Sequence, residues 1–194
     1  MVRNLDKYRV RVLCEDRKHF DFVRGFLLSQ GIKNAHKFID IELPEGTQSG
    51  EQYVREHFVS EFKKFARSRE NILLVVVQDI DKDAISPENV KSELSNLIQK
   101  AGLGTIDDSD KILFVFPKRN IETWLVWLGF NSKIEKINEV MNYRFNNQQL
   151  PPAMAGKRAG KLYALSRSDE SVCAHAPESL VFACKEFDLL CSNL

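Results

Sequence analysis

The sequence lacks any segment that would place the chain in or across a membrane. Nothing at the N-terminus resembles a signal peptide, because residues 1–7 are mostly polar and charges follow throughout. The longest uninterrupted apolar run, Ile72 to Val77, is far shorter than a membrane span. We therefore expect a soluble, cytoplasmic protein with no membrane partner.

Motifs for soft metal ions and for nucleotides are also missing. The four cysteines form no C-x-x-C pair and no metal-ligand spacing with the four histidines. We assign no role to any of the histidines and expect the thiols to be reduced and mostly buried. Neither G-x-x-x-x-G-K-[ST] nor G-x-G-x-x-G occurs, so no motif supports binding of ATP or of a dinucleotide.

The chain has almost no net charge. Its formal charge is +1, so no field of the whole molecule favours nucleic acid, and such a partner would have to bind a local patch. The 194 residues are 43% hydrophobic and 28% charged, which suits one globular body with a substantial core.

Apolar patterning predicts alternating strands and helices. Strands are expected at 8–14, 37–43, 72–77 and 111–116. Helices are expected at 17–30, at 51–68, from Ser86-Pro87 to Gly102, and at 120–129, 133–142, 157–166 and 177–190, with a loop at 146–156. This order predicts an α/β fold with a mostly parallel four-stranded sheet flanked by helices. We expect residues 1–130 to form the α/β domain and 131–194 a helical C-terminal extension packed on it.

Acidic residues follow three of the four predicted strands. Glu15 follows the first strand, Asp79, Asp81 and Asp83 follow the third, and Glu122 lies in the first turn of the helix after the fourth. In parallel sheets, ligands bind beyond the carboxyl ends of the strands, where these acids should meet. Each acid alone could instead stabilise a helix N-terminus. Together they would raise one another's pKa unless a cation joined them.

Clustered carboxylates are typical of sites for hard divalent cations. Mg²⁺ usually binds one or two carboxylates and keeps several waters for a phosphate substrate. Such an ion activates water and neutralises charge on a phosphoryl oxygen. The residues alone therefore favour phosphodiester chemistry that depends on Mg²⁺ or Mn²⁺.

The same pattern resembles the Toprim (topoisomerase–primase) fold. That family's signature is a Glu after the first strand and a D-x-D after the third, which here are Glu15 in VLCED and Asp79 and Asp81 in VVVQDIDKD. The segment RNIETWLVWL, 119–128, resembles the F-E-x-W-L segment of small single-domain Toprim-like proteins related to OLD and RloB-type nucleases. Those proteins occur in bacterial phage-defence and abortive-infection systems. The resemblance covers about residues 8–130.

The resemblance implies a Toprim-like Rossmannoid fold and a nuclease that hydrolyses DNA or RNA, with a further protein of a defence system as a partner. Glu15 would be the general base or a metal-linked acid. The metal ligands that it implies are Glu15, Asp79, Asp81, Asp83 and Glu122.

The chain departs from the family pattern at three positions. Asp16 stands where the family often has Gly, and His19 stands where it has another acid. Ala84 stands where a Gly often follows the D-x-D. Asp16 and Asp83 are weaker candidates that would reach the metal through water.

A stretch without acids supplies basic residues. No Asp or Glu occurs from 142 to 168, whereas Lys157 and Lys161 lie four positions apart and would share a helix face. This face is either solvated or contacts phosphate, in which case Lys157 or Lys161 would stabilise transition-state charge. Lys118 lies nearer the acids and could do the same. The expected nucleic-acid contacts are Lys118, Arg119, Lys157, Arg158 and Lys161.

Two other functions remain open. The departures at His19 and Ala84 would also suit a non-catalytic Toprim-like module that binds nucleic acid or a partner protein. A receiver-like phosphoacceptor domain fits poorly, since 64 positions separate Glu15 from Asp79.

Overall fold

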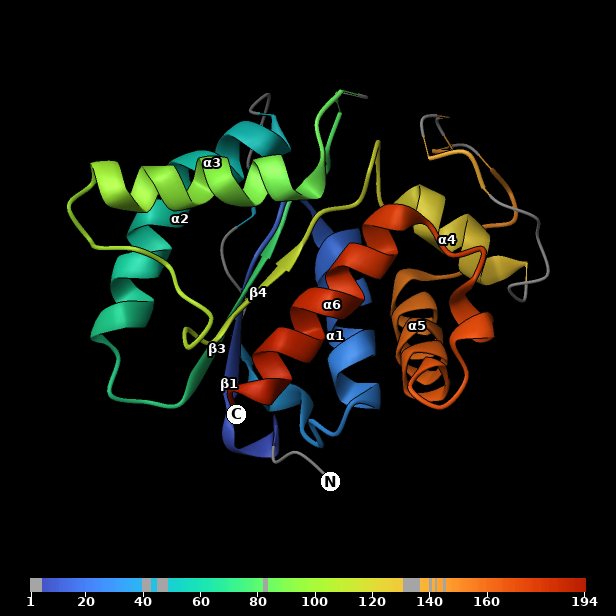
Figure 1. Cartoon of the computed structure of the whole chain (residues 1–194), viewed down its shortest axis with the longest axis horizontal. Helices are drawn as coiled ribbons and strands as arrows, with labels where there is room; N and C mark the ends of the chain where they lie inside the picture. The colour runs from blue at the N-terminus through green and yellow to red at the C-terminus, as the bar shows by residue number, and fades with distance from the viewer. Residues whose placement is uncertain are drawn as a thin grey trace.

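The computed structural model describes residues 5–39, 43–44, 49–81, 84–130, 137–139, 141, 143–144 and 146–194. Figure 1 shows the elements along the chain. The strands are β1 (Arg9–Leu13), β2 (Phe38–Ile39), β3 (Ile72–Val77) and β4 (Ile112–Val115). The helices are α1 (Arg17–Ser29), α2 (Gly50–Arg67), α3 (Pro87–Lys100), α4 (Glu122–Gly129), α5 (Pro152–Ser166) and α6 (Glu178–Ser192), with short 3₁₀ turns η1 (Leu5–Lys7), η2 (Ala35–Lys37) and η3 (Glu170–Cys173).

The described strands form one sheet, and every pair in it is parallel. The order is β2-β1-β3-β4, which confirms the expected α/β fold. β1 and β3 are the two central strands and pair from Arg9 and Ile72 to Leu13 and Val76. Their carboxyl ends therefore lie side by side, and the residues that follow them are brought to one edge of the sheet.

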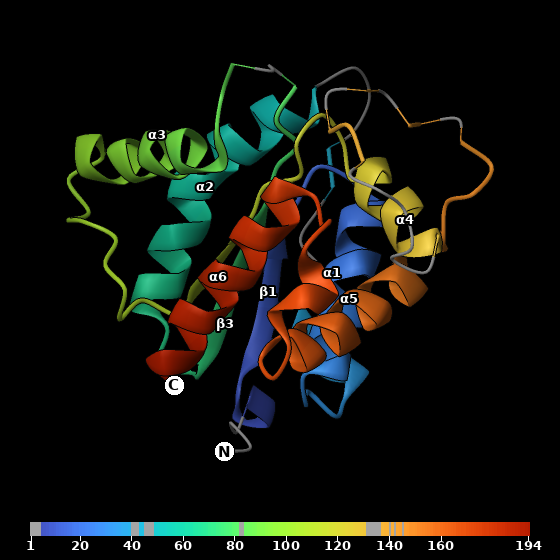
Figure 2. The same ribbon diagram turned by 45° about the vertical axis from the view of Figure 1, so that its right-hand side comes forward.

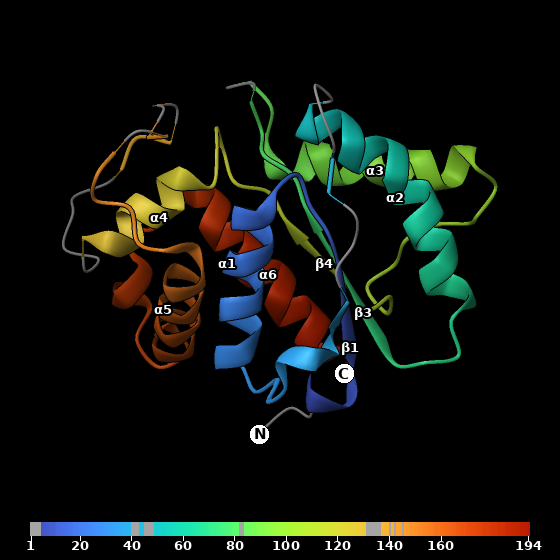
Figure 3. The ribbon, with the colours of Figure 1, turned by 180° about the vertical axis from the view of Figure 1, so that it is seen from behind.

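Helices cover both faces of the sheet. Figures 1 and 3 show α2 and α3 on one face and α1 and α6 on the other, with α4 and α5 farther out. Successive side chains of β3 point to opposite faces of the sheet, so the strand contributes to two apolar clusters. Leu74 and Val76 pack with α2 and α3, whereas Val75 and Val77 pack on the opposite face. Both faces of β3 are buried, which explains why its sequence is apolar without alternation.

The C-terminal third belongs to the same packed body as residues 1–130. α6 contacts β4, and α5 lies along α1, as Figure 2 shows. None of the described helices is both long enough and apolar enough to cross a bilayer.

Two helix predictions differ from the structure. The expected loop at 146–156 is wrong at its end, because α5 begins at Pro152. Proline suits the first turn of a helix, and small residues there fit against α1. The expected helix at 133–142 falls mostly outside the described residues, and residues 137–139 are not helical.

Glycines allow the backbones of α1 and α5 to come into contact. A Cβ at Gly25 would lie 2.2 Å from the carbonyl oxygen of Ala153, and one at Gly156 would lie 2.0 Å from that of Phe22. Near the other end of α1, Gln30 Nε2 donates to the carbonyl oxygen of Gly160 at 2.8 Å. The two helices therefore run in the same direction, away from the edge where β1 and β3 end.

We predict that Gly156→Ala lowers the melting temperature. The added methyl group would overlap the Phe22 carbonyl, and overpacking of this kind costs about 1–3 kcal/mol. Alanine's higher helix propensity offsets up to about 1 kcal/mol of that cost. Ala164→Leu on the exposed face of α5 is the control and should leave thermal unfolding unchanged. A Gly156→Ala protein as stable as wild type would contradict the close α1–α5 contact.

Candidate functional site

A hydrogen bond joins the ends of the two central strands. Glu15 Oε1 accepts it from the backbone N–H of Asp79, at 2.8 Å. Gly50, the first residue of α2, lies against the same carboxyl group, because a Cβ at position 50 would be 2.5 Å from Glu15 Oε2. The lack of a side chain at Gly50 thus leaves room for Glu15 at the N-terminus of α2.

His19 connects Asp79 to the start of α1. Its side chain is 1% exposed. Nε2 lies 2.9 Å from Asp79 Oδ1, and Nδ1 lies 2.7 Å from Asp16 Oδ1. Asp16 is also the N-cap of α1 and accepts from the backbone N–H of His19. Because both ring nitrogens face carboxylate oxygens, both carry a proton, and the ring is an imidazolium.

The contacts of His19 with the two carboxylates explain the pKa shifts of His19 and Asp16. Burial alone would lower the pKa of His19, but the charge of Asp79 and the hydrogen bonds to both carboxylates raise it well above 6.5. Burial raises the pKa of Asp16, but the hydrogen bonds and charge of His19 outweigh it and lower that pKa to about 2. The histidine and Asp16 are therefore both charged at neutral pH.

Lys18 forms an ion pair with Glu122, the acid that follows β4. Glu122 is buried in the first turn of α4, as expected from the sequence. Its Oε1 accepts a hydrogen bond from Lys18 Nζ at 2.5 Å, although the two residues are 104 positions apart. Two consecutive residues of α1, Lys18 and His19, thus each hold one carboxylate of this edge.

The acids act on one another electrostatically. Burial and the charge of Asp79 raise the pKa of Glu15 from 4.5 to about 8, and Asp81 adds to the shift. Burial also raises the pKa of Asp79, against the opposing effect of His19, and the charges of Glu122 and Asp16 contribute. The acids that follow β1, β3 and β4 therefore converge within reach of one another's charge.

The loop after β4 lies beside Asp81. Lys118 forms an isolated parallel bridge with Ile80, and the backbone N–H of Arg119 donates to the Ile80 carbonyl at 2.9 Å. Arg119 has a φ of 69°, and its Nη1 donates to the carbonyl oxygen of Asp81 at 3.0 Å. These bonds hold Arg119 in a left-handed conformation that residues with side chains rarely adopt. Asp83 lies outside the described residues.

The basic residues of α5 lie farther along α1. Gly160 packs near Ser29, at the end of α1 away from the acids. At 1.5 Å per residue, Arg17 and Ser29 are about 18 Å apart along the helix axis. The structure therefore does not bring Lys161 to the acids, and the transition-state role that the sequence suggested for it has no geometric support. Lys157 and Lys161 are exposed and, with Arg158 and Met154, line a shallow hollow.

The acid edge has the donors that a hard cation requires. In the described part of the chain, neither Glu15 nor Asp81 forms an ion pair with a basic residue. Gln78, which precedes Asp79 in the sequence, has a buried Oε1 without a hydrogen-bond partner in that part of the chain. A donor set made only of carboxylate oxygens is the kind that Mg²⁺ or Mn²⁺ binds. Among the same residues, no three acidic, His or Cys side chains are already grouped to hold a metal, so a shell would require the exposed Asp81 to reorient.

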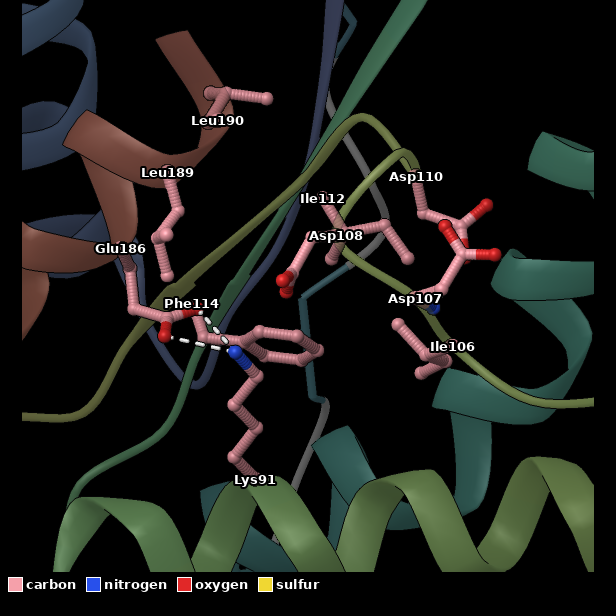
Figure 4. A pocket seen from close by; sticks show the side chains of 10 residues that line it. All are labelled: Lys91, Ile106, Asp107, Asp108, Asp110, Ile112, Phe114, Glu186, Leu189 and Leu190. Atoms are coloured by element: carbon pink, nitrogen blue, oxygen red, sulfur yellow. Dashed lines mark hydrogen bonds and ion pairs between the residues drawn. The ribbon is translucent and has the colours of Figure 1, made fainter. Parts of the chain in front are cut away.

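A second hollow, which is lined in part by acids, lies near the start of β4, at the opposite end of that strand from Glu122 (Figure 4). Asp107, Asp108 and Asp110 lie on its rim. Lys91 Nζ donates to both carboxylate oxygens of the buried Glu186, at 2.8 and 2.9 Å. This pair is neutralised within the chain, and the hollow shares no residue with the acid edge.

His19, Lys18 and Gly50 are site residues that the sequence did not identify. His19, Val23 and Phe26 recur at helical spacing and are all buried, so the apolar face of α1 was a signal that His19 is buried too. No comparable signal exists for Lys18 or Gly50, because their contacts are with residues distant in sequence.

The predicted residues separate into two groups. Glu15, Asp79, Asp81, Lys118, Arg119 and Glu122 come together at the carboxyl edge of the sheet, whereas Lys157, Arg158 and Lys161 lie on α5. Comparison of the chain with protein families, with curated proteins and with solved structures finds no match.

We predict that Glu15→Gln makes the metal-free protein less sensitive to rising pH. The pKa of Glu15 is about 8 in the folded chain and 4.5 ordinarily, so the folded state holds a proton that the unfolded state releases. Its contribution to stability is complete below about pH 4.5 and is lost as pH rises through about 8. Melting temperatures measured between these values should fall more steeply for wild type than for Glu15→Gln. The exposed Glu70→Gln is the control, and identical slopes in all three proteins would contradict the raised pKa.

Proposed function

We propose that the chain is a divalent-metal-dependent, Toprim-like nuclease that hydrolyses phosphodiester bonds in DNA or RNA. The observation that carries the proposal is the convergence of Glu15, Asp79, Asp81 and Glu122 at the carboxyl edge of an all-parallel sheet. The sequence resemblance to small defence nucleases extends the proposal to a role in phage defence, with a further protein of such a system as a partner.

Asp79 and Asp81 would hold Mg²⁺ or Mn²⁺, with Glu15 beside them. When bound, the ion supplies Lewis-acid polarisation of the phosphate and lowers the pKa of water. Glu122 would support the shell from beside Asp79, since its charge acts on that residue.

Glu15 is the base of the proposed reaction. It takes a proton from the attacking water as the water oxygen bonds to phosphorus, and the bond from phosphorus to the leaving ester oxygen breaks. That oxygen then takes a proton from solvent. The hydrogen bond from the backbone N–H of Asp79 to Glu15 Oε1 positions this carboxylate beside the proposed metal ligands, where a base can reach the attacking water.

Basic side chains near the acids and on α5 would bind the substrate. Lys118 and Arg119 lie on the loop beside Asp81, where a cation would stabilise charge on the phosphate. The exposed Lys157 and Lys161 lie along α1, farther from the acids, and would contact neighbouring phosphates of the same strand.

We predict that Asp79→Asn and Asp81→Asn each reduce cleavage by on the order of a hundredfold or more, because each removes a charge that would hold the ion. Cleavage of labelled single- and double-stranded DNA and RNA is measured with Mg²⁺, with Mn²⁺ and with EDTA. Asp108→Asn, which removes an exposed acid at the second hollow, is the matched control and should cleave like wild type.

Three results would count against the nuclease. These are cleavage that survives both Asp substitutions, cleavage that persists in EDTA, or no cleavage of any substrate by a folded wild-type protein. Tight nucleic-acid binding with no cleavage in any metal would favour the non-catalytic module. The neutralisation of Glu122 and Asp79 by Lys18 and His19 is the observation that would suit that alternative.

We predict that Lys157→Ala combined with Lys161→Ala weakens nucleic-acid binding and leaves the rate of cleavage of bound substrate unchanged. Each lost phosphate contact should reduce the slope of log K against log salt by about 0.7–0.9. Lys63→Ala combined with Lys100→Ala removes the same charge from exposed positions on α2 and α3 and serves as the control. If the slope of log K against log salt is the same in both double variants, Lys157 and Lys161 of α5 do not contact phosphates of the substrate.

A further inference from the structure

We propose that a cavity between α4, α5 and α6 is a binding site for a small, neutral and mostly apolar molecule that carries a hydrogen-bond acceptor. The cavity has a volume of about 120 Å³. The three helices that enclose it lie on the side of the molecule away from α2 and α3 (Figure 1). None of the described residues that line it belongs to the acid edge, so the inference goes beyond the proposed nuclease function and does not depend on it.

The walls of the cavity determine the size and polarity of the ligand. Apolar side chains make up most of the lining, among them Leu162 of α5, Leu180 and Val181 of α6, and Trp127 of α4. An apolar molecule gains free energy when it leaves water for such surroundings. In another protein, a cavity of about 150 Å³ with apolar walls holds benzene, so this one suits a molecule about as large as a single six-membered ring.

Trp127 is the reason to expect a hydrogen-bond acceptor on the ligand. Its side chain is 1% exposed, and its buried Nε1 has no hydrogen-bond partner in the described part of the chain. The hydroxyl groups of the lining are already engaged, since Tyr163 donates to Asp188 Oδ1 at 2.5 Å and Ser166 donates to the Tyr163 carbonyl oxygen at 2.9 Å. A buried donor without an acceptor lowers stability, and a ligand that supplies the acceptor recovers that loss.

The charged residues of the lining favour a neutral ligand. Lys185 and Asp188 both line the cavity and lie close together on α6. Lys185 is exposed, so the cavity reaches the surface beside it. Because the two side chains have opposite charges, their fields largely cancel and attract neither an anion nor a cation.

The test is calorimetric titration of the full chain with two probes of the same shape. Cyclohexanone and methylenecyclohexane differ only in that a CH₂ group replaces the carbonyl oxygen, and both should bind wild type and raise its melting temperature. Trp127→Phe removes the N–H but keeps an aromatic ring, so it should weaken cyclohexanone binding by about two- to tenfold more than methylenecyclohexane binding. Ala176→Leu adds atoms to the cavity wall and should abolish binding of both probes. Ala164→Leu, on the exposed face of α5, is the matched control and should bind both like wild type.

Three results would overturn the inference. These are a wild-type chain that binds neither probe, which would mean that water alone fills the cavity, binding that survives Ala176→Leu, and equal weakening of both probes by Trp127→Phe. If Trp127→Phe does not fold, the comparison of wild type with Ala176→Leu and Ala164→Leu still decides whether the cavity binds the probes. Cleavage of nucleic acid enters none of these measurements, so failure here would leave the proposed nuclease untouched.

Discussion

Asp79 is the carboxylate on which the arrangement of the candidate site depends. Its backbone N–H binds Glu15 and its side chain binds His19, so one residue ties β1, β3 and α1 together. Burial raises its pKa, and the contact with His19 opposes that effect. His19 in turn is held by Asp16, the N-cap of α1. The first turn of α1 is therefore both the start of a helix and the support of a buried charge.

The orientation of α1 couples this site to the rest of the fold. Farther down the helix, Gly25 and Phe22 contact Ala153 and Gly156 of α5 at backbone distance. That contact fixes how α1 lies across the sheet, and hence where Lys18 and His19 point at its upper end. The C-terminal third of the chain thus helps to position a site whose acids all come from the first 130 residues.

Local patterns in the sequence were enough to predict three of the strands and most of the helices. Of the strand expected at 37–43, only Phe38–Ile39 is found as β2, Lys37 and Leu43 are not in a strand, and residues 40–42 lie outside the described part of the chain. The apolar run of β3 and the helical spacing in α1, α2 and α3 are properties of neighbouring residues, and the structure has these elements close to where they were expected. The start of α5 was missed because residues 152–156, apart from Met154, are small and have little apolar periodicity. They are helical because they pack against α1, which is a tertiary effect.

The sequence by itself determined that acids follow the strands of a parallel sheet, and therefore that Glu15, Asp79, Asp81 and Glu122 would meet at one edge. Only the tertiary structure decided what each acid binds there. Lys18 reaches Glu122 across 104 positions and His19 reaches Asp79 across 60. The periodicity of a strand or helix specifies which face a side chain occupies, but not which distant side chain lies opposite. A histidine without ligand spacing therefore proved to be the buried partner of two carboxylates, because packing brought them to it.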